Sequence, residues 1–151
     1  MFEKRMKEFR ENLLKTDIKV ALITDEDSVY YLSGYYDYLH MEFGRPTVLA
    51  VPADGDTLLI TPAIDLNTAT EHAKVDRILA WNDGMGSEWR TELSSIVNGV
   101  GKVGIEFGHM PQLVRSYVDE LVGQKDITTV TPILSKMRMI KSEQELQLAR
   151  H

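Results

Sequence analysis

Short apolar runs alternate with stretches of helical periodicity along most of this chain, and that alternation constrains its fold more than any other feature. The strand-like runs include Val20–Ile23, Thr47–Val51 and Lys102–Glu106, and amphipathic stretches lie between such runs. Strands that alternate with helices are typical of an α/β fold. We therefore predict an α/β domain with a mixed, mostly parallel sheet and helices on both faces.

Turn residues and helix-ending residues predict the remaining elements. Pro52–Asp56 is a turn-rich link between two strand-like runs, so an antiparallel hairpin is expected there. Asp25–Asp27 suit the positive end of a short helix better than a metal site, and Gly34 is expected to end that helix in the left-handed conformation. Further strands are expected at residues 57–61, 75–81 and 127–130, and helices at residues 2–13, 28–32, 65–73, 87–97 (with Ser87 as N-cap), 111–121 (opened by Pro111) and 131–140.

The composition argues against several functional classes. With 151 residues the chain is long enough for one domain with its own core. The net charge of -6 leaves no basic surface for nucleic acid, and without cysteine the chain can form no disulfide, thiolate nucleophile or Cys-ligated zinc site. No apolar run has the length of a membrane span, and the N-terminus lacks the pattern of a secretory signal. We therefore predict a cytoplasmic protein with no membrane partner.

Tyr30–Pro46 is the most unusual stretch, because it holds five of the six tyrosines. It connects two strand-like runs, and a tyrosine offers an apolar face with a polar tip, which suits a surface that meets a partner. The candidate interface residues are Tyr35, Tyr36, Tyr38 and His40. The alternative is that Tyr30, Tyr31 and Leu32 fill the core while the other tyrosines simply lie on the surface.

The sequence predicts no catalytic centre, no metal ligands and no cofactor site within this chain. Residues 99–104 match G-x-G-x-x-G, but they follow a predicted helix and enter a strand, which is the reverse of the order in a dinucleotide-binding site. The four histidines lack the spacing of metal ligands.

The C-terminal residues carry a helix-start signal with little helix after it. Ser142–Glu145 has the pattern of a capping box, and only six residues follow. An isolated helix needs about 12–15 residues to be stable in water. We therefore expect the chain to be part of a longer protein and residues 143–151 to be loosely held.

Five stretches also carry a family pattern. They are Val29–Tyr35, Phe43–Arg45, Val51–Gly55, Val103–Phe107 and Met137–Glu145. In this order, they resemble the N-terminal domain of the creatinase/aminopeptidase P/prolidase (pita-bread) superfamily, with the closest likeness to creatinase. The resemblance implies an α/β fold with a ribonuclease H-like motif, in which residues 1–138 form the N-terminal domain and residues 139–151 begin the linker and first helix of a missing C-terminal catalytic domain.

The same resemblance implies what the parent protein does. The parent is expected to be a homodimer that hydrolyses a C–N bond in a small carboxylate-bearing substrate, as an Xaa-Pro dipeptidase (prolidase), an aminopeptidase P or a creatine amidinohydrolase. Metal-dependent relatives hold their ligands in the catalytic domain. A dinuclear Mn, Co or Zn site is therefore expected only in the missing domain, and only if the parent is a peptidase.

Phe43 and Arg45 are the candidate substrate-binding residues. In the creatinase branch a Phe and an Arg of this domain reach the active site of the other subunit, and Phe43-Gly44-Arg45 matches that motif. An arginine can grip a carboxylate with two hydrogen bonds, and a phenylalanine ring can face a cationic group. Two alternatives stay open: Arg45 pairs with Glu42 at the surface, or the chain is a stand-alone α/β binding module that uses its Tyr-rich loop.

Overall fold

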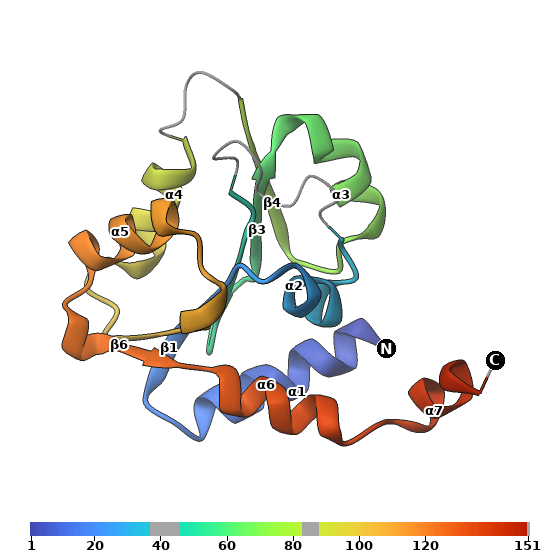
Figure 1. Ribbon diagram of the computed structural model, residues 1–151. Coiled ribbons are helices and arrows are strands. Elements are labelled where there is room, and N and C mark those ends of the chain that lie inside the picture. Colours follow the sequence, from blue (N-terminus) through green and yellow to red (C-terminus); the bar gives the residue numbers. More distant parts are fainter. Residues whose placement is uncertain (37–45, 83–87, 151) are drawn as a thin grey trace.

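The structure, a computed structural model, describes residues 1–36, 46–82 and 88–150 (Figure 1). Six strands form one sheet in the order β4-β3-β2-β1-β5-β6. The strands are β1 Ile18–Ile23, β2 Val48–Pro52, β3 Leu58–Pro62, β4 Arg77–Trp81, β5 Lys102–Ile105 and β6 Ile127–Thr129. The α-helices are α1 Phe2–Leu14, α2 Glu26–Ser33, α3 Leu66–His72, α4 Glu88–Val97, α5 Gln112–Leu121, α6 Thr131–Met139 and α7 Glu143–Ala149, and the 3₁₀ turns are η2 Ala63–Asp65, η3 Phe107–His109 and η4 Gln124–Asp126.

The sheet is mixed. β1 runs antiparallel to β2, and β2 runs antiparallel to β3 across the expected hairpin. The other three neighbouring pairs, β1–β5, β3–β4 and β5–β6, are parallel. The predicted mixed, mostly parallel sheet is therefore confirmed.

Two apolar layers cover the sheet, one on each face. Ala21 and Ile23 pack in the layer that α1, α2, α3 and α6 supply, whereas Val20 and Leu22 pack in the layer that α4 and α5 supply. Successive residues of a strand point to opposite faces, so the continuous apolar run of β1 serves both layers. Figure 1 shows α4 and α5 on one side of the sheet and α2 and α3 on the other, which confirms helices on both faces.

Local signals in the sequence set the helix ends to within a residue or two. The Asp25 carboxylate caps α2 by accepting a hydrogen bond from the Ser28 backbone N–H at 3.1 Å, and Gly34 follows the helix with a φ of 81°. Pro111 stands at the N-cap of α5 and not inside its first turn. The predicted N-cap Ser87 lies outside the described residues.

Candidate functional site: the carboxyl edge of the sheet

The strand register gathers most of the noteworthy side chains at one edge of the sheet. Ile23 at the end of β1 lies opposite Leu49 near the start of β2, and Leu22 pairs with Ile105 at the end of β5. The ends of β3 and β4 meet at the same edge, where Pro62 pairs with Trp81. Ligand sites of open α/β sheets lie outside the carboxyl ends of their strands. This carboxyl edge is therefore where a functional site is expected.

Both stems of the Tyr-rich stretch are fastened to the carboxyl edge. The Tyr35 hydroxyl lies 3.2 Å from the Thr61 hydroxyl, which also lies 3.3 Å from the Thr47 hydroxyl. On the other stem, the Trp81 indole N–H donates to the Pro46 carbonyl at 3.1 Å. These contacts hold Tyr35 and Pro46, the described residues on either side of residues 37–45, against the sheet.

The structure corrects one of the candidate interface residues. Tyr35 is only 1% exposed and packs in the apolar layer of α1 and α2, so its ring belongs to the core of this domain. The alternative interpretation places Tyr30, Tyr31 and Leu32 in the core. It is right for Leu32, which is buried, but wrong for Tyr30, which is 45% exposed. Tyr36 is half-buried, with its ring 6.2 Å from that of Tyr30.

The other candidates of this stretch cannot be compared with the structure. Phe43, Arg45, Tyr38 and His40 lie outside the described residues, as does Glu42. Their roles in substrate binding and at an interface therefore stay predictions.

A buried carboxylate cluster lies at the same edge. Asp25 follows β1 and Glu106 follows β5, and the Ser28 hydroxyl lies between them, 3.0 Å from Asp25 Oδ2 and 3.0 Å from Glu106 Oε2. Ser28 is fully buried and Glu106 is 5% exposed. Burial raises the pKa of Glu106, because it disfavours the charged form, and the neighbouring Asp25 acts in the same direction.

Two basic side chains, His109 and Arg138, border this carboxylate cluster. His109 Nδ1 lies 3.5 Å from Asp25 Oδ1, and its backbone carbonyl accepts a hydrogen bond from the Thr24 hydroxyl at 2.7 Å. The Arg138 guanidinium, which comes from the last turn of α6, donates to the Ser28 hydroxyl at 3.4 Å.

Among the described residues, no group of three or more His, Asp or Glu side chains is arranged to hold a metal ion, and no helix has the length and apolar character needed to cross a bilayer.

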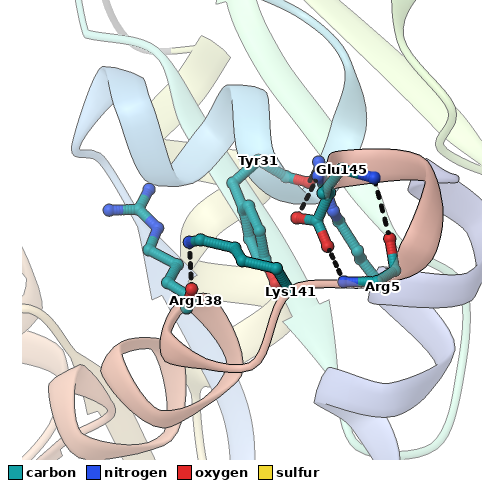
Figure 2. A network of polar contacts seen from close by, with 6 residues as sticks. Arg5, Tyr31, Arg138, Lys141 and Glu145 are labelled. Carbon is teal, nitrogen blue, oxygen red and sulfur yellow. Dashed lines mark hydrogen bonds and ion pairs between the residues drawn. The ribbon is translucent and has the colours of Figure 1, made fainter. Parts of the chain in front are cut away.

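A second polar network joins α7 to α1 and α2 (Figure 2). The Arg5 guanidinium donates to Glu145 Oε1 at 2.6 Å and to the Tyr31 backbone carbonyl at 3.1 Å. It also lies over the Tyr31 ring, 4.2 Å from the ring centroid, and the Arg138 guanidinium lies 5.2 Å from the same centroid. Tyr31 thus contacts two cations, one from each end of the chain.

The predicted capping box forms at the start of α7. The Ser142 hydroxyl accepts from the Glu145 backbone N–H at 3.3 Å, and the Glu145 carboxylate accepts from the Ser142 backbone N–H at 2.7 Å. This backbone hydrogen bond, together with the Ser142 hydroxyl and the Arg5 guanidinium, lowers the pKa of Glu145 to about 2. α7 buries none of its residues, and Leu146 and Leu148 are exposed as expected. Polar contacts are therefore the main tie between α7 and the rest of the domain.

Sequence reasoning missed the long-range partners in both clusters. Glu106 is one such residue: it follows an apolar strand in the same way as Asp25, and the adjacency of parallel strands could have placed the two together. Arg5 is the other, since it is one of several cations on α1 and lies 140 positions from its partner Glu145. No local pattern in the sequence distinguishes it.

Comparison with known proteins assigns the family. Residues 5–140 match the family model described as the Creatinase/Prolidase N-terminal domain, so this chain belongs to that family. Among curated proteins, the creatinase of Bacillus sp. (strain B-0618) is 22% identical over 152 residues, which cover 98% of this chain and 36% of that creatinase. The chain therefore spans about a third of the length of this relative.

Solved structures show the same fold. The Creatinase/Prolidase N-terminal domain of an X-Pro dipeptidase from Streptococcus pyogenes superimposes with a TM-score of 0.74 at 16% identity, covering 91% of this chain and 100% of that chain. A prolidase from Thermococcus sibiricus superimposes with a TM-score of 0.81 at 21% identity, covering 97% of this chain but 39% of that chain. The domain thus corresponds in one case to a complete crystallised chain and in the other to part of a longer enzyme.

Proposed function

We propose that this chain is the non-catalytic N-terminal domain of a creatinase/prolidase-like hydrolase, in which it supports dimerisation and contributes to the active site of the partner subunit. One observation carries the proposal: the family match runs over residues 5–140, yet the chain equals only 36% of creatinase and 39% of the Thermococcus sibiricus prolidase. The chemistry of such a protein would then reside in a C-terminal catalytic domain.

The carboxyl edge supports a role for the Tyr-rich stretch in this arrangement. Its stems are fastened through Thr61 and Trp81, so the stretch is attached at both sides to a rigid sheet. Phe43 and Arg45 are the residues with the chemistry to bind a substrate that carries a carboxylate and a cationic group. We propose that they do so in the partner subunit of a homodimer.

The reaction of the parent is hydrolysis of a C–N bond, and the two kinds of relative define two substrate classes. A creatinase-like parent would act on a guanidino acid without a metal, and a prolidase-like parent would act on an Xaa-Pro dipeptide with a dinuclear metal site in its catalytic domain. We expect the 151-residue chain alone to hydrolyse neither substrate. Its cytoplasmic location also stays a prediction from the sequence.

The test uses the longer protein that contains this domain, with Arg45 replaced. Arg45→Ala would leave a substrate carboxylate unpaired, a loss of about 2–5 kcal/mol. Since each ~1.4 kcal/mol is tenfold, kcat/KM should fall roughly 30-fold or more with the fold unchanged. Arg45→Lys should recover part of the activity, because an ammonium cannot reproduce the two-pronged contact.

A mixing experiment decides whether Arg45 acts across the subunit boundary. Arg45→Ala subunits are mixed with subunits that carry an inactivating change in the catalytic domain, so that each heterodimer keeps one intact composite site. Activity should reappear from the two inactive parents. A mixture that stays inactive despite proven subunit exchange would refute the role in trans. The matched control is Glu42→Ala: if Arg45 merely pairs with Glu42, both variants should change stability by about 0–1 kcal/mol and leave the kinetics unchanged.

A further inference from the structure

Three polar side chains of the carboxyl edge meet on a single hydroxyl group. Ser28 Oγ lies 3.0 Å from Asp25 Oδ2, 3.0 Å from Glu106 Oε2 and 3.4 Å from Arg138 Nη2. A hydroxyl has one proton to donate and two lone pairs that accept. Because a guanidinium only donates, Arg138 occupies one lone pair of Ser28.

Counting protons shows that one carboxyl group must supply its own. The single Ser28 proton can serve Asp25 or Glu106 but not both, and each oxygen–oxygen distance is that of a hydrogen bond. With both carboxylates ionised, one of these contacts would bring two proton-free oxygens together. Both contacts are hydrogen bonds when one carboxyl group is protonated and donates to Ser28, while Ser28 donates to the other carboxyl group.

The surroundings identify Glu106 as the protonated group. Asp25 already accepts from the Ser28 backbone N–H at the start of α2, and its Oδ1 lies 3.5 Å from His109 Nδ1, so both of its oxygens have a nitrogen partner. Glu106 Oε1, in contrast, is buried and has no hydrogen-bond partner among the described residues. A neutral carbonyl oxygen tolerates that position at much lower cost than a charged one.

We propose that Glu106 holds a proton in this arrangement, and that losing it draws the Arg138 guanidinium from the Tyr31 ring onto the Glu106 carboxylate. Arg138 has a long hydrogen bond to Ser28 and a ring contact of 5.2 Å, both weaker than a direct ion pair with a buried carboxylate. It lies in the last turn of α6, three residues before Lys141, so its movement would reach the α6–α7 connection. This inference concerns the described chain alone and does not depend on the proposed function.

The charged groups that face Glu106 set the direction of its pH response. Burial, the largest cause, and Asp25 raise the pKa of Glu106 and the net pKa is raised, whereas Arg138 and a protonated His109 oppose the rise, as would Ser28 if it donated to an ionised Glu106. A raised pKa means that the folded chain binds this proton more tightly than the unfolded chain. The contribution of Glu106 to stability is therefore full below the ordinary pKa of about 4.3 and is lost as pH rises through the folded pKa.

The wild-type chain provides the first test, by ¹³C NMR titration of the glutamate side-chain carboxyl groups. The Glu106 resonance, assigned by its loss in Glu106→Gln, should titrate above the other glutamates, and the Tyr31 ring resonances should shift with the same midpoint. The glutamine keeps a donor for Ser28 but cannot ionise, so the Tyr31 shift should vanish in the variant. A Glu106 midpoint at or below about 4.3 would overturn the proton assignment. If the Tyr31 ring resonances do not shift as Glu106 titrates, the proposed movement of Arg138 is wrong.

Two variants then separate this proton arrangement from its reverse. In Ser28→Ala a neutral Glu106 loses its acceptor, so its pKa should fall; if Ser28 instead donated to an ionised Glu106, the pKa would rise. Asp25→Asn keeps an N-cap residue for α2 but removes the adjacent negative charge, so the Glu106 midpoint should also fall. An unchanged midpoint in Asp25→Asn would contradict the coupling between the two carboxyl groups.

Discussion

Replacing Arg5 by Met should release α7 from the domain while leaving the fold intact. The Arg5–Glu145 ion pair is 2.6 Å long between side chains that are 13% and 15% exposed, and Arg5 also donates to the Tyr31 carbonyl. A hydrogen bond to a charged group contributes about 1.5–3 kcal/mol, and the remaining exposure lowers that figure. We expect the docking of α7 to weaken by about 1–2 kcal/mol, a factor of roughly 5–30 in its population. Methionine keeps the long apolar stem and the helix propensity of α1.

The measurement is the helical population and amide exchange of residues 143–149, followed by NMR in the wild type and in Arg5→Met. Arg10→Met is the matched control, because Arg10 also lies on α1 but donates to the Gly55 carbonyl at 2.7 Å and not to Glu145. Exchange in α7 should rise in Arg5→Met only. If amide exchange in α7 rises equally in both variants, or rises in neither, the ion pair does not hold α7.

The Arg5–Glu145 ion pair also makes stability depend on pH in a defined direction. The pKa of Glu145 is lowered to about 2, so its contribution is present above the ordinary value of about 4.3 and is lost as pH falls through about 2. The backbone N–H of Ser142 is the largest cause of this shift, ahead of Arg5. In Arg5→Met the Glu145 pKa should therefore rise but stay below about 4.3, because the capping box remains. A return to the ordinary value would mean that the box does not form without Arg5.

Two further predictions concern the core. Gly104→Ala should destabilise the domain by about 1–3 kcal/mol in urea unfolding, since the added Cβ would lie 2.3 Å from Val130 Cγ1 and 3.1 Å from Ile18 Cγ2. Gly108→Ala, where the added Cβ meets nothing within 4 Å, is its control. Tyr35→Phe should lower the free energy of unfolding by about 1 kcal/mol, because the hydroxyl contact with Thr61 is lost. An unchanged free energy of unfolding would show that this contact does not stabilise the domain.

The elements that could be predicted from the sequence are those set by neighbouring residues. Apolar spacing located α1, and Met6, Phe9 and Leu13 on that face are buried. The acidic start of α2 and the capping box of α7 were predicted, because the residues concerned lie within about three positions of the helix ends that they stabilise. Such contacts form from local backbone geometry, so a linear pattern is enough to identify them.

Tyr35 shows why the rest was not predictable in the same way. It comes just after α2, where no helical or strand periodicity applies, and the left-handed Gly34 reverses the chain so that the ring enters the core. A Cβ on Gly34 would lie 3.0 Å from the Phe2 ring and 3.2 Å from the His72 carbonyl, so this turn depends on two segments distant in sequence. The candidate site has the same difficulty, because its contacts depend on strand register and helix packing.

The charges around Tyr31 connect the two clusters. Hydrogen bonds and ring contacts run without interruption from Glu106 through Ser28, Arg138, Tyr31 and Arg5 to Glu145. Two arginines on one ring would repel each other unless anions lie nearby, and Asp25 and Glu145 supply one negative charge for each. Lys141 and Glu8, at the exposed rim of this network, add one positive and one negative charge. With His109 counted as neutral, the sum is zero only when Glu106 is neutral. An ionised Glu106 would add a negative charge to a buried site, and the positive group best placed to compensate is Arg138, so the charge balance and the proton count assign the same state to Glu106.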